Sequence, residues 1–166
     1  ILFYGYGSYG LNSEAEFRAT IIPLLKRGFV FCILHVRGGG ELGRDWYENG
    51  RMHKKLNTFY DFNDGVKKIV AKGFGAPDQI FAMGGSAGGL LMGAIANLEP
   101  SLYKGIIASV PFMDVLTTMS DPSIPLTTFE YDEWGDPSIA EDYFYIKSYS
   151  PYDNIKRQAY PAMYVS

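Results

Sequence analysis

A serine set between glycines offers the clearest chemistry in this sequence. Ser86 lies within Gly84-Gly-Ser-Ala-Gly88, after the apolar segment 80–83 and before a run of small and aliphatic residues. A strand, a sharp turn and a helix in this order form a nucleophile elbow, which raises the serine hydroxyl above a sheet where it can attack an acyl carbonyl. Gly84 and Gly88 suit the turn because a Cβ atom at either position would collide with the tightly folded backbone. A chance Gly-x-Ser-x-Gly is the alternative, but the flanking strand and helix favour the nucleophile.

The general base for this serine is harder to find. In such a fold the acid and the histidine of a catalytic triad follow the serine along the chain. His35 and His53 are the only histidines, and both precede Ser86. The apolar run around His35 predicts a strand residue near a buried end, whereas His53 lies in a polar, basic loop. We therefore expect this chain to be part of a catalytic domain whose triad acid and histidine follow Ser166.

The composition predicts one compact domain and argues against a membrane or nucleic-acid partner. Hydrophobic residues make up 47% of the 166 residues and charged residues 20%, with a net charge of −3. No apolar run approaches the length of a membrane span, and no basic stripe is available to neutralise phosphates. Cys32 is the single cysteine, so no internal disulfide can form and a reducing, cytoplasmic compartment is favoured. No metal-ligand spacing is present, and we predict no metal and no cofactor.

Alternating apolar strands and helices indicate an α/β fold. We expect strands at residues 1–4, 29–36, 80–83, 105–110 and 162–166. We expect helices from a capping box at Ser13 to Gly28, from Thr58 to Gly73 and after Ser86, with residues 111–150 irregular. The continuous apolar run 29–36 predicts a strand covered on both faces. The predicted architecture is that of an α/β hydrolase, a mostly parallel sheet with helices on both faces.

A glycine pattern near the start of the chain suggests a different ligand. Gly5-Tyr-Gly-Ser-Tyr-Gly10 follows the first predicted strand and matches the dinucleotide fingerprint. A dinucleotide site would need an acidic residue at the end of the second strand, where this chain has Arg37. An NADP-binding variant with Arg37 stays open, but oxyanion-hole donors of hydrolases also come from such a loop. We favour the hydrolase interpretation.

Four segments together resemble the prolyl oligopeptidase family of serine peptidases. They are Tyr4 to Gly10, Arg37 to Trp46, Gly84 to Gly89 and Glu130 to Gly135, in the family's order. Ser8-Tyr9 and the segment 124–130 are closest to the oligopeptidase B branch. The resemblance implies that residues 1–166 are part of the α/β-hydrolase catalytic domain of a peptidase that cleaves short peptides after Arg or Lys. The N-terminal β-propeller that family members carry would lie outside this chain.

The resemblance also assigns roles at the elbow. It implies that Ser86 is the nucleophile that forms an acyl-enzyme and that the Tyr6 hydroxyl donates to the oxyanion. The backbone N–H of Ala87 is the second donor, which gains from the dipole of the helix that it begins. For Tyr6, packing of the aromatic ring over the elbow is the alternative.

Specificity is expected to depend on carboxylates. Glu130 and Asp132 are two residues apart, so in an extended segment their side chains would share one face. Two carboxylates in a partly desolvated pocket suit a guanidinium group. By the resemblance they match the P1 pocket of oligopeptidase B, although Asp132 stands where Glu is common and Phe129 where Gly is common. A solvated acidic loop is the alternative.

A second acidic pair resembles a family feature associated with a basic residue at P2. Glu14 and Glu16 match this pair, at positions where relatives commonly have Asp. The alternative is structural, since acidic residues are favoured in the first turn of a helix and Glu16 also completes the predicted capping box.

Two other function classes stay open beside the peptidase. An esterase or lipase would share Ser86 and the fold but would have an apolar acyl pocket in place of Glu130 and Asp132. A non-catalytic binding domain is the third alternative, because the chain contains no well-placed triad partner. The isolated 166-residue chain is expected to be inactive.

Overall fold

Five parallel strands form the centre of the molecule. The computed structural model describes all residues from Ile1 to Ser166. The sheet order is β2-β1-β3-β4-β5, and every neighbouring pair is parallel. The strands are β1 (Leu2–Tyr4), β2 (Phe31–Ile33), β3 (Phe81–Gly85), β4 (Gly105–Ser109) and β5 (Ala162–Val165). The predicted parallel α/β sheet is therefore confirmed, with each strand inside or beside its expected segment.

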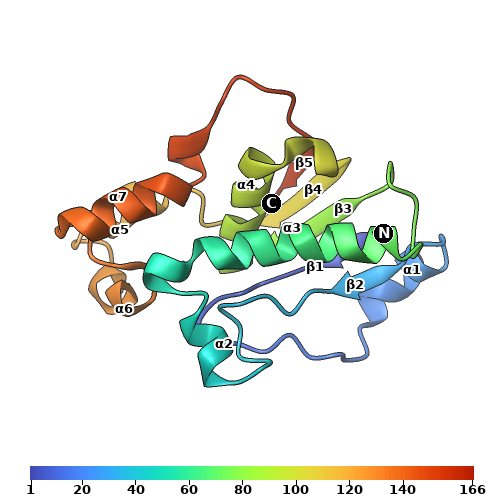
Figure 1. Cartoon of the computed structure of the whole chain (residues 1–166), viewed down its shortest axis with the longest axis horizontal. Helices are drawn as coiled ribbons and strands as arrows, with labels where there is room; N and C mark the ends of the chain where they lie inside the picture. The colour runs from blue at the N-terminus through green and yellow to red at the C-terminus, as the bar shows by residue number, and fades with distance from the viewer.

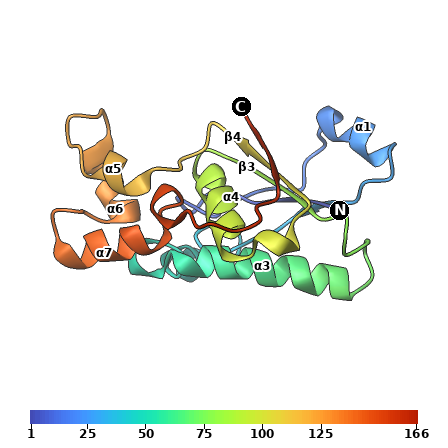
Figure 2. The same ribbon diagram turned by 90° about the horizontal axis from the view of Figure 1, so that it is seen from above.

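Helices cover both faces of this sheet. They are α1 (Ile22–Leu25), α2 (Arg44–Glu48), α3 (Leu56–Ala71), α4 (Ala87–Leu98), α5 (Val115–Met119), α6 (Tyr131–Trp134) and α7 (Ala140–Tyr149). Single 3₁₀ turns are η1 (Ala19–Ile21), η2 (Met52–Lys54), η3 (Pro100–Leu102), η4 (Thr127–Glu130) and η5 (Tyr152–Asn154). Figure 2 shows α3 and α4 on one face of the sheet and α1 on the other. None of the helices combines the length and apolar character that crossing a bilayer requires.

The core lies between the sheet and the layer of α3 and α4. Every residue of α4 from Ala87 to Ala96 is buried, as its small and aliphatic sequence predicts. The longer helix α3 buries one stripe, in which Phe59, Phe62 and Val66 are fully inaccessible. Burying each large apolar side chain contributes roughly 1.5–3 kcal/mol. This packing holds the start of α4, and with it Ser86, firmly against the sheet.

The helix predicted from Ser13 is wrong in its first half. Residues 11–18 form no helix, and the chain first turns at η1 before the single helical turn of α1. The reason is visible at both ends of the segment. The backbone N–H of Ser13 donates to the Glu41 carboxylate at 2.9 Å, so no capping box forms with Glu16. Pro23 lies in the first turn of α1, the one part of a helix that accepts it readily.

The second strand is also shorter and more exposed than predicted. β2 is an edge strand of the sheet, and all three of its residues are only half-buried. The prediction of a strand covered on both faces is therefore wrong for this chain. His35 is exposed rather than near a buried end, and its Nε2 lies 2.9 Å from the carbonyl oxygen of Ser13.

The prediction of an irregular segment at residues 111–150 is wrong as well. This segment contains α5, α6 and α7, which gather at the end of the sheet where the strands finish, at the left of Figure 1. Asp114 caps α5 by accepting a hydrogen bond from the Thr117 N–H at 3.1 Å. Of these short helices, α5 and α6 contribute to one wall of a cleft beside Ser86.

Candidate active site

The turn between β3 and α4 has the geometry of a nucleophile elbow. Ser86 follows the last residue of β3 and precedes the first of α4, with φ 55° and ψ −118°. A positive φ is unfavourable for a residue with a side chain, and such strain is kept where a function requires it. The carbonyl oxygen of Ser86 accepts hydrogen bonds from Gly89 N at 2.9 Å and Phe112 N at 3.1 Å. The Ser86 residue itself is exposed, which leaves its hydroxyl open to a substrate.

Two glycines make this turn possible. A Cβ atom on Gly84 would overlap the carbonyl oxygen of Gly88 and lie 2.8 Å from its carbonyl carbon. A Cβ atom on Gly88 would lie 2.7 Å from the carbonyl oxygen of Gly5 and 3.3 Å from the Cα of Tyr6. The close approach that the sequence predicts is therefore confirmed at both positions. It brings the segment directly after β1, which contains Gly5 and Tyr6, against the elbow.

An open cleft of about 350 Å³ adjoins the elbow. Its lining residues come from the first loop, the elbow and the segment after β4: Tyr9, Ser86, Ala87, Val110, Pro111, Phe112, Thr118, Met119, Ile124, Pro125, Leu126, Thr127, Glu130 and Trp134. Five non-glycine residues of the chain have a positive φ, and Tyr9, Ser86, Val110 and Leu126 are four of them. This concentration of backbone strain in one cleft marks it as the candidate active site.

Two hydrogen-bond donors lie at the elbow. Ala87 is buried at the first position of α4, where the unpaired backbone N–H groups and the helix dipole favour negative charge. Tyr6 follows β1 and is half-buried beside the elbow. Burial raises the pKa of the Tyr6 hydroxyl, and the nearby Ser86 side chain counteracts part of that shift. A protonated phenol and the free backbone N–H at the start of a helix are groups that can stabilise an oxyanion, and these roles for Tyr6 and Ala87 stay predictions.

Glu130 is the only carboxylate among the residues that line the cleft. Its Oε2 accepts hydrogen bonds from the Tyr9 hydroxyl at 2.7 Å and from Trp134 Nε1 at 3.1 Å. Its Oε1 has no hydrogen-bond partner within the protein. Burial and the negative charge of Glu130 raise the pKa of the Tyr9 hydroxyl, which keeps this donor protonated. The arrangement holds one oxygen of Glu130 and leaves the other for a ligand.

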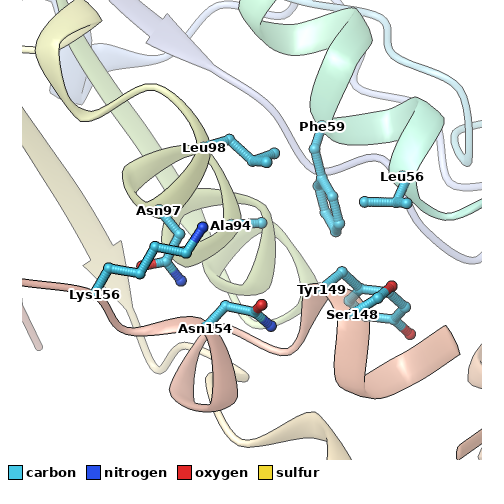
Figure 3. A pocket seen from close by; sticks show the side chains of 9 residues that line it. All are labelled: Leu56, Phe59, Ala94, Asn97, Leu98, Ser148, Tyr149, Asn154 and Lys156. Carbon is cyan, nitrogen blue, oxygen red and sulfur yellow. The ribbon is translucent and has the colours of Figure 1, made fainter. Parts of the chain in front are cut away.

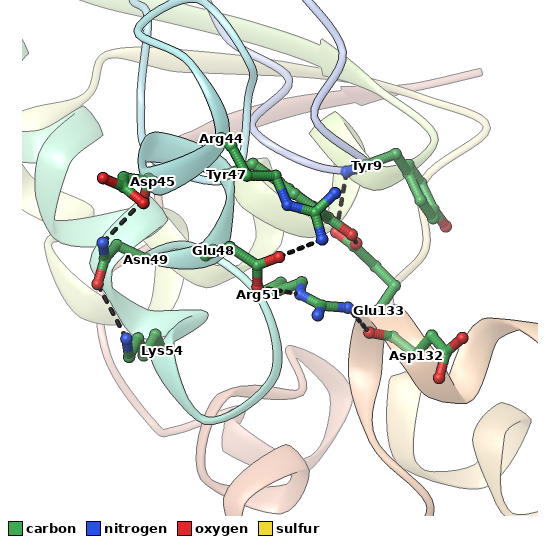
Figure 4. Close-up of polar contacts among 10 residues, drawn as sticks. All are labelled: Tyr9, Arg44, Asp45, Tyr47, Glu48, Asn49, Arg51, Lys54, Asp132 and Glu133. Atoms are coloured by element: carbon green, nitrogen blue, oxygen red, sulfur yellow. Dashed lines mark hydrogen bonds and ion pairs between the residues drawn. The ribbon is translucent and has the colours of Figure 1, made fainter.

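The predicted pairing of Glu130 with Asp132 does not form. Glu130 ends η4 and Asp132 lies in α6, so the segment is helical and the prediction of an extended strand with a shared face is wrong. Asp132 is exposed and is not among the residues that line the cleft. Its backbone carbonyl oxygen accepts a hydrogen bond from Arg51 Nη1 at 2.5 Å, as Figure 4 shows.

The acidic pair Glu14 and Glu16 also lies away from the cleft. Both residues are exposed in the non-helical segment 11–18, so the structural alternative of a helical first turn is wrong. Glu16 borders a separate hollow beside β2. A role in binding a second basic residue stays a prediction.

Glu133 is a buried acid that the sequence did not single out, and it binds the loop beside the cleft. Glu133 accepts hydrogen bonds from Tyr9 N at 2.9 Å and from the Tyr47 hydroxyl at 2.7 Å (Figure 4). Burial and the hydrogen bond to Glu133 raise the pKa of Tyr47 to about 12. Helical spacing was the available signal. Residues 130, 133 and 134 share one face of a helix, whereas in an extended segment residue 133 would lie on the face opposite to 130 and 134.

A buried lysine is the second residue that was missed. Lys55 lies between η2 and α3 and is 1% exposed. Its Nζ donates to the carbonyl oxygen of Gly7 at 2.6 Å and to Ser8 Oγ at 2.7 Å. Burial lowers the pKa of Lys55 to about 7, against an opposing attraction from Glu133. The sequence held no signal for this burial, because Lys54 and Lys55 together suggest a solvated loop.

Neither histidine reaches the cleft. His53 Nε2 lies 2.5 Å from Asp142 Oδ1, a contact that joins η2 to α7, and His35 contacts Ser13. Neither residue lines the cleft that contains Ser86. The expectation that the histidines of this chain are poor candidates for the base agrees with these positions.

A smaller hollow lies between α3, α4 and the end of α7. It has a volume of about 100 Å³ and is shown in Figure 3 with Leu56, Phe59 and Tyr149 among its lining side chains. The Tyr149 hydroxyl is buried without a hydrogen-bond partner, and burial raises its pKa well above the ordinary value. No residue of this hollow belongs to the cleft at Ser86.

The dinucleotide alternative fails on the local structure. A dinucleotide site needs a helix that begins directly after the glycine-rich loop and points its N-terminus at the pyrophosphate. Residues 11–18 after Gly10 form no helix. Arg37, the residue that an NADP-binding variant would need, is instead held by Asp61 through hydrogen bonds of 2.6 and 2.7 Å.

The parallel sheet and the strained serine between β3 and α4 have the arrangement of the α/β-hydrolase fold. Comparison with known proteins then gives the family. Residues 15–166 match the model of the prolyl oligopeptidase family, and the chain belongs to this family of serine peptidases.

Individual relatives span the whole of this chain. Protease 2 of Moraxella lacunata is 55% identical over 100% of the chain, and dipeptidyl aminopeptidase BI of Pseudoxanthomonas mexicana is 54% identical over 99%. The structure of oligopeptidase B from Leishmania major superimposes with a TM-score of 0.96 at 50% identity over 99% of the chain. The chain spans only 24%, 23% and 23% of these three proteins, respectively.

Substituting Gly84 by Ala is expected to destabilise the elbow. The new Cβ atom would overlap the Gly88 carbonyl group, and overpacking of this kind costs typically 1–3 kcal/mol. Urea unfolding measures the change in the free energy of unfolding. Gly85→Ala is the matched control, because its Cβ atom would come no closer than 3.3 Å to the backbone of Ser109. Equal losses in the two variants would show that the close approach at Gly84 is not the cause.

Proposed function

We propose that this chain is the nucleophile-bearing part of an endopeptidase that cleaves short peptides after Arg or Lys. The observation that carries the proposal is one cleft that holds both Ser86 and the carboxylate of Glu130. The family supports the hydrolysis of peptide bonds. The names of the relatives describe different activities and so do not fix the substrate preference. The support for a preference for basic residues comes from the chemistry of the cleft.

The reaction would begin at the elbow. The Ser86 hydroxyl oxygen attacks the scissile carbonyl carbon, and its proton passes to a general base. Negative charge develops on the carbonyl oxygen, where the Tyr6 hydroxyl and the Ala87 N–H stabilise it. The tetrahedral intermediate then collapses to an acyl-enzyme as the protonated amine leaves, and water attacks the ester in the second half. The base is a histidine supplied from outside these 166 residues, since neither His35 nor His53 lines the cleft.

Glu130 would bind the basic side chain of the substrate. Its Oε1 has no partner within the protein, while Tyr9 and Trp134 hold Oε2. A guanidinium or ammonium group can approach the free oxygen from a cleft that is otherwise mostly apolar, where a charge-assisted hydrogen bond is strong. Asp132 is exposed outside the cleft, so we assign it a smaller, long-range contribution to the attraction of the cation.

An esterase is the second candidate, and the apolar lining favours it. Val110, Phe112, Met119, Ile124 and Leu126 would accommodate an acyl chain. The two functions separate in a comparison of an arginyl amide with a short-chain aryl ester as substrates. We expect the protein, as its gene encodes it, to hydrolyse the arginyl amide with the higher kcat/KM.

Removing the Tyr6 hydroxyl is expected to slow the chemical step. Loss of one oxyanion donor typically costs 10²–10³ in kcat, so we expect Tyr6→Phe to lower kcat at least about tenfold with little change in KM. Steady-state kinetics on an arginyl peptide amide measure both constants. Tyr4→Phe is the matched control, because Tyr4 lies within β1 and its ring packs against the Arg18 guanidinium. An unchanged kcat in the Tyr6 variant would remove this hydroxyl from the mechanism.

Neutralising Glu130 is expected to remove the preference for basic residues. A hydrogen bond to a charged group is worth about 1.5–3 kcal/mol, so Glu130→Gln should lower kcat/KM for an arginyl substrate about tenfold or more. The same variant should change kcat/KM for a norleucyl substrate little. Asp132→Asn is the comparison, and we expect a loss of less than about threefold because its carboxylate is solvated. A larger loss in the Asp132 variant would contradict the assignment of Glu130 as the main contact.

A further inference from the structure

Lys55 binds the loop that carries the oxyanion tyrosine. Tyr6 is followed directly by Gly7 and Ser8, and the Lys55 ammonium donates to the carbonyl oxygen of Gly7 and to the hydroxyl of Ser8. Ser8 is completely buried, and Lys55 is nearly so. These two hydrogen bonds therefore lie on the protein side of the loop, where water cannot replace them.

Other contacts hold the same segment from different directions. A Cβ atom on Gly7 would lie 2.5 Å from Thr58 Cγ2 and 2.6 Å from Val36 Cγ2, so the backbone packs tightly there. The N–H of Tyr9 donates to the buried carboxylate of Glu133. Lys55 and Glu133 thus hold the two ends of residues 7–9. Lys55 donates hydrogen bonds to Gly7 and Ser8, and Glu133 accepts one from the Tyr9 N–H.

The same lysine also contacts the wall of the cleft. Its Nζ lies 5.1 Å from the centre of the Trp134 ring, within the range of a cation–π interaction. Trp134 Nε1 donates to Glu130, and the Tyr9 ring packs edge-on against Trp134 at 5.6 Å. Lys55 is therefore joined to the oxyanion loop directly and to the Glu130 carboxylate through one tryptophan.

Stability alone does not explain a charged residue at this position. Burial lowers the pKa of Lys55 to about 7, so the fold loses free energy by holding the proton there. An apolar side chain of similar length would avoid that cost. A buried ammonium that is retained beside a catalytic loop is better explained by what its hydrogen bonds position.

We propose that Lys55 is a positioning residue for the oxyanion hole, which holds residues 7–9 so that the Tyr6 hydroxyl faces Ser86. The inference rests on the proposed function, because Tyr6 must act as an oxyanion donor for its position to matter to turnover. Lys55 itself does not touch the substrate. It acts through Tyr6, so its effect on kcat must depend on the Tyr6 hydroxyl.

A double-mutant cycle tests this dependence in the protein as its gene encodes it. Lys55→Met keeps the length of the side chain and removes both hydrogen bonds. We expect Lys55→Met to lower kcat about tenfold or more for an arginyl peptide amide, since small misplacements of catalytic groups are costly. In a Tyr6→Phe background the same change should lower kcat less than about twofold. An equal loss in both backgrounds would overturn the proposal.

Two further variants separate a specific effect of Lys55 from a general effect of removing a lysine or from misfolding. Lys67→Met is the matched control, because Lys67 lies on α3 and pairs with Glu99 at the surface; its kcat should be unchanged. Ser8→Ala removes the hydroxyl acceptor alone, and we expect a smaller loss of kcat in the same direction. Should Lys55→Met fail to fold, an unchanged kcat in Ser8→Ala would overturn the proposal.

Hydrogen exchange separates this inference from the proposed function. In Lys55→Met, amide exchange in residues 5–11 should be faster than in the unaltered protein, while exchange in β4, two places from β1 in the sheet, stays the same. Unchanged exchange in residues 5–11 would refute the clamp even in an active enzyme. An inactive unaltered protein would refute the proposed function and the catalytic part of this inference, and faster exchange in Lys55→Met would then establish Lys55 as a purely structural clamp.

Discussion

The close approach of three backbone segments at the elbow is the constraint on which the site depends. The end of β1, the end of β3 and the start of α4 meet where Gly84, Gly88 and Gly5 have no side chains to separate them. This contact forces Ser86 into a strained conformation and brings Tyr6 beside it. The strain is sustained because α4 is buried along most of its length, so the helix cannot shift to relieve it.

Buried polar groups determine the rest of the cleft. Lys55 and Glu133 lie beneath the first loop and bind its backbone, while Tyr9 and Trp134 hold one oxygen of Glu130. Groups of this kind are costly to bury unless each finds a partner. The network thus makes the position of the loop and the position of Glu130 depend on each other, and one set of contacts serves both the oxyanion hole and the substrate carboxylate.

Glycine spacing and short apolar runs predict the elbow and the strands, whereas the capping box expected at Ser13, the helical segment around Glu130 and the burial of Lys55 depend on tertiary contacts. The elbow, β4 and β5 follow from glycine spacing and short apolar runs, and the structure confirms them. The segment around Glu130 is helical because Trp134 and Glu133 turn inward on a helical face, which an extended interpretation could not show. Burial of Lys55 had no sequence signal at all, since its partners are the backbone of Gly7 and the hydroxyl of Ser8 far away in the chain.

A crystal structure of the gene's complete product with a peptide aldehyde ending in arginine tests the central claim most directly. An aldehyde forms a reversible hemiacetal with an activated serine and so reproduces the tetrahedral intermediate. The account predicts a covalent bond from Ser86 Oγ, with the hemiacetal oxygen between the Tyr6 hydroxyl and the Ala87 N–H and the guanidinium against Glu130. An aldehyde bonded to another residue, or a guanidinium that turns away from Glu130 into solvent, would contradict it.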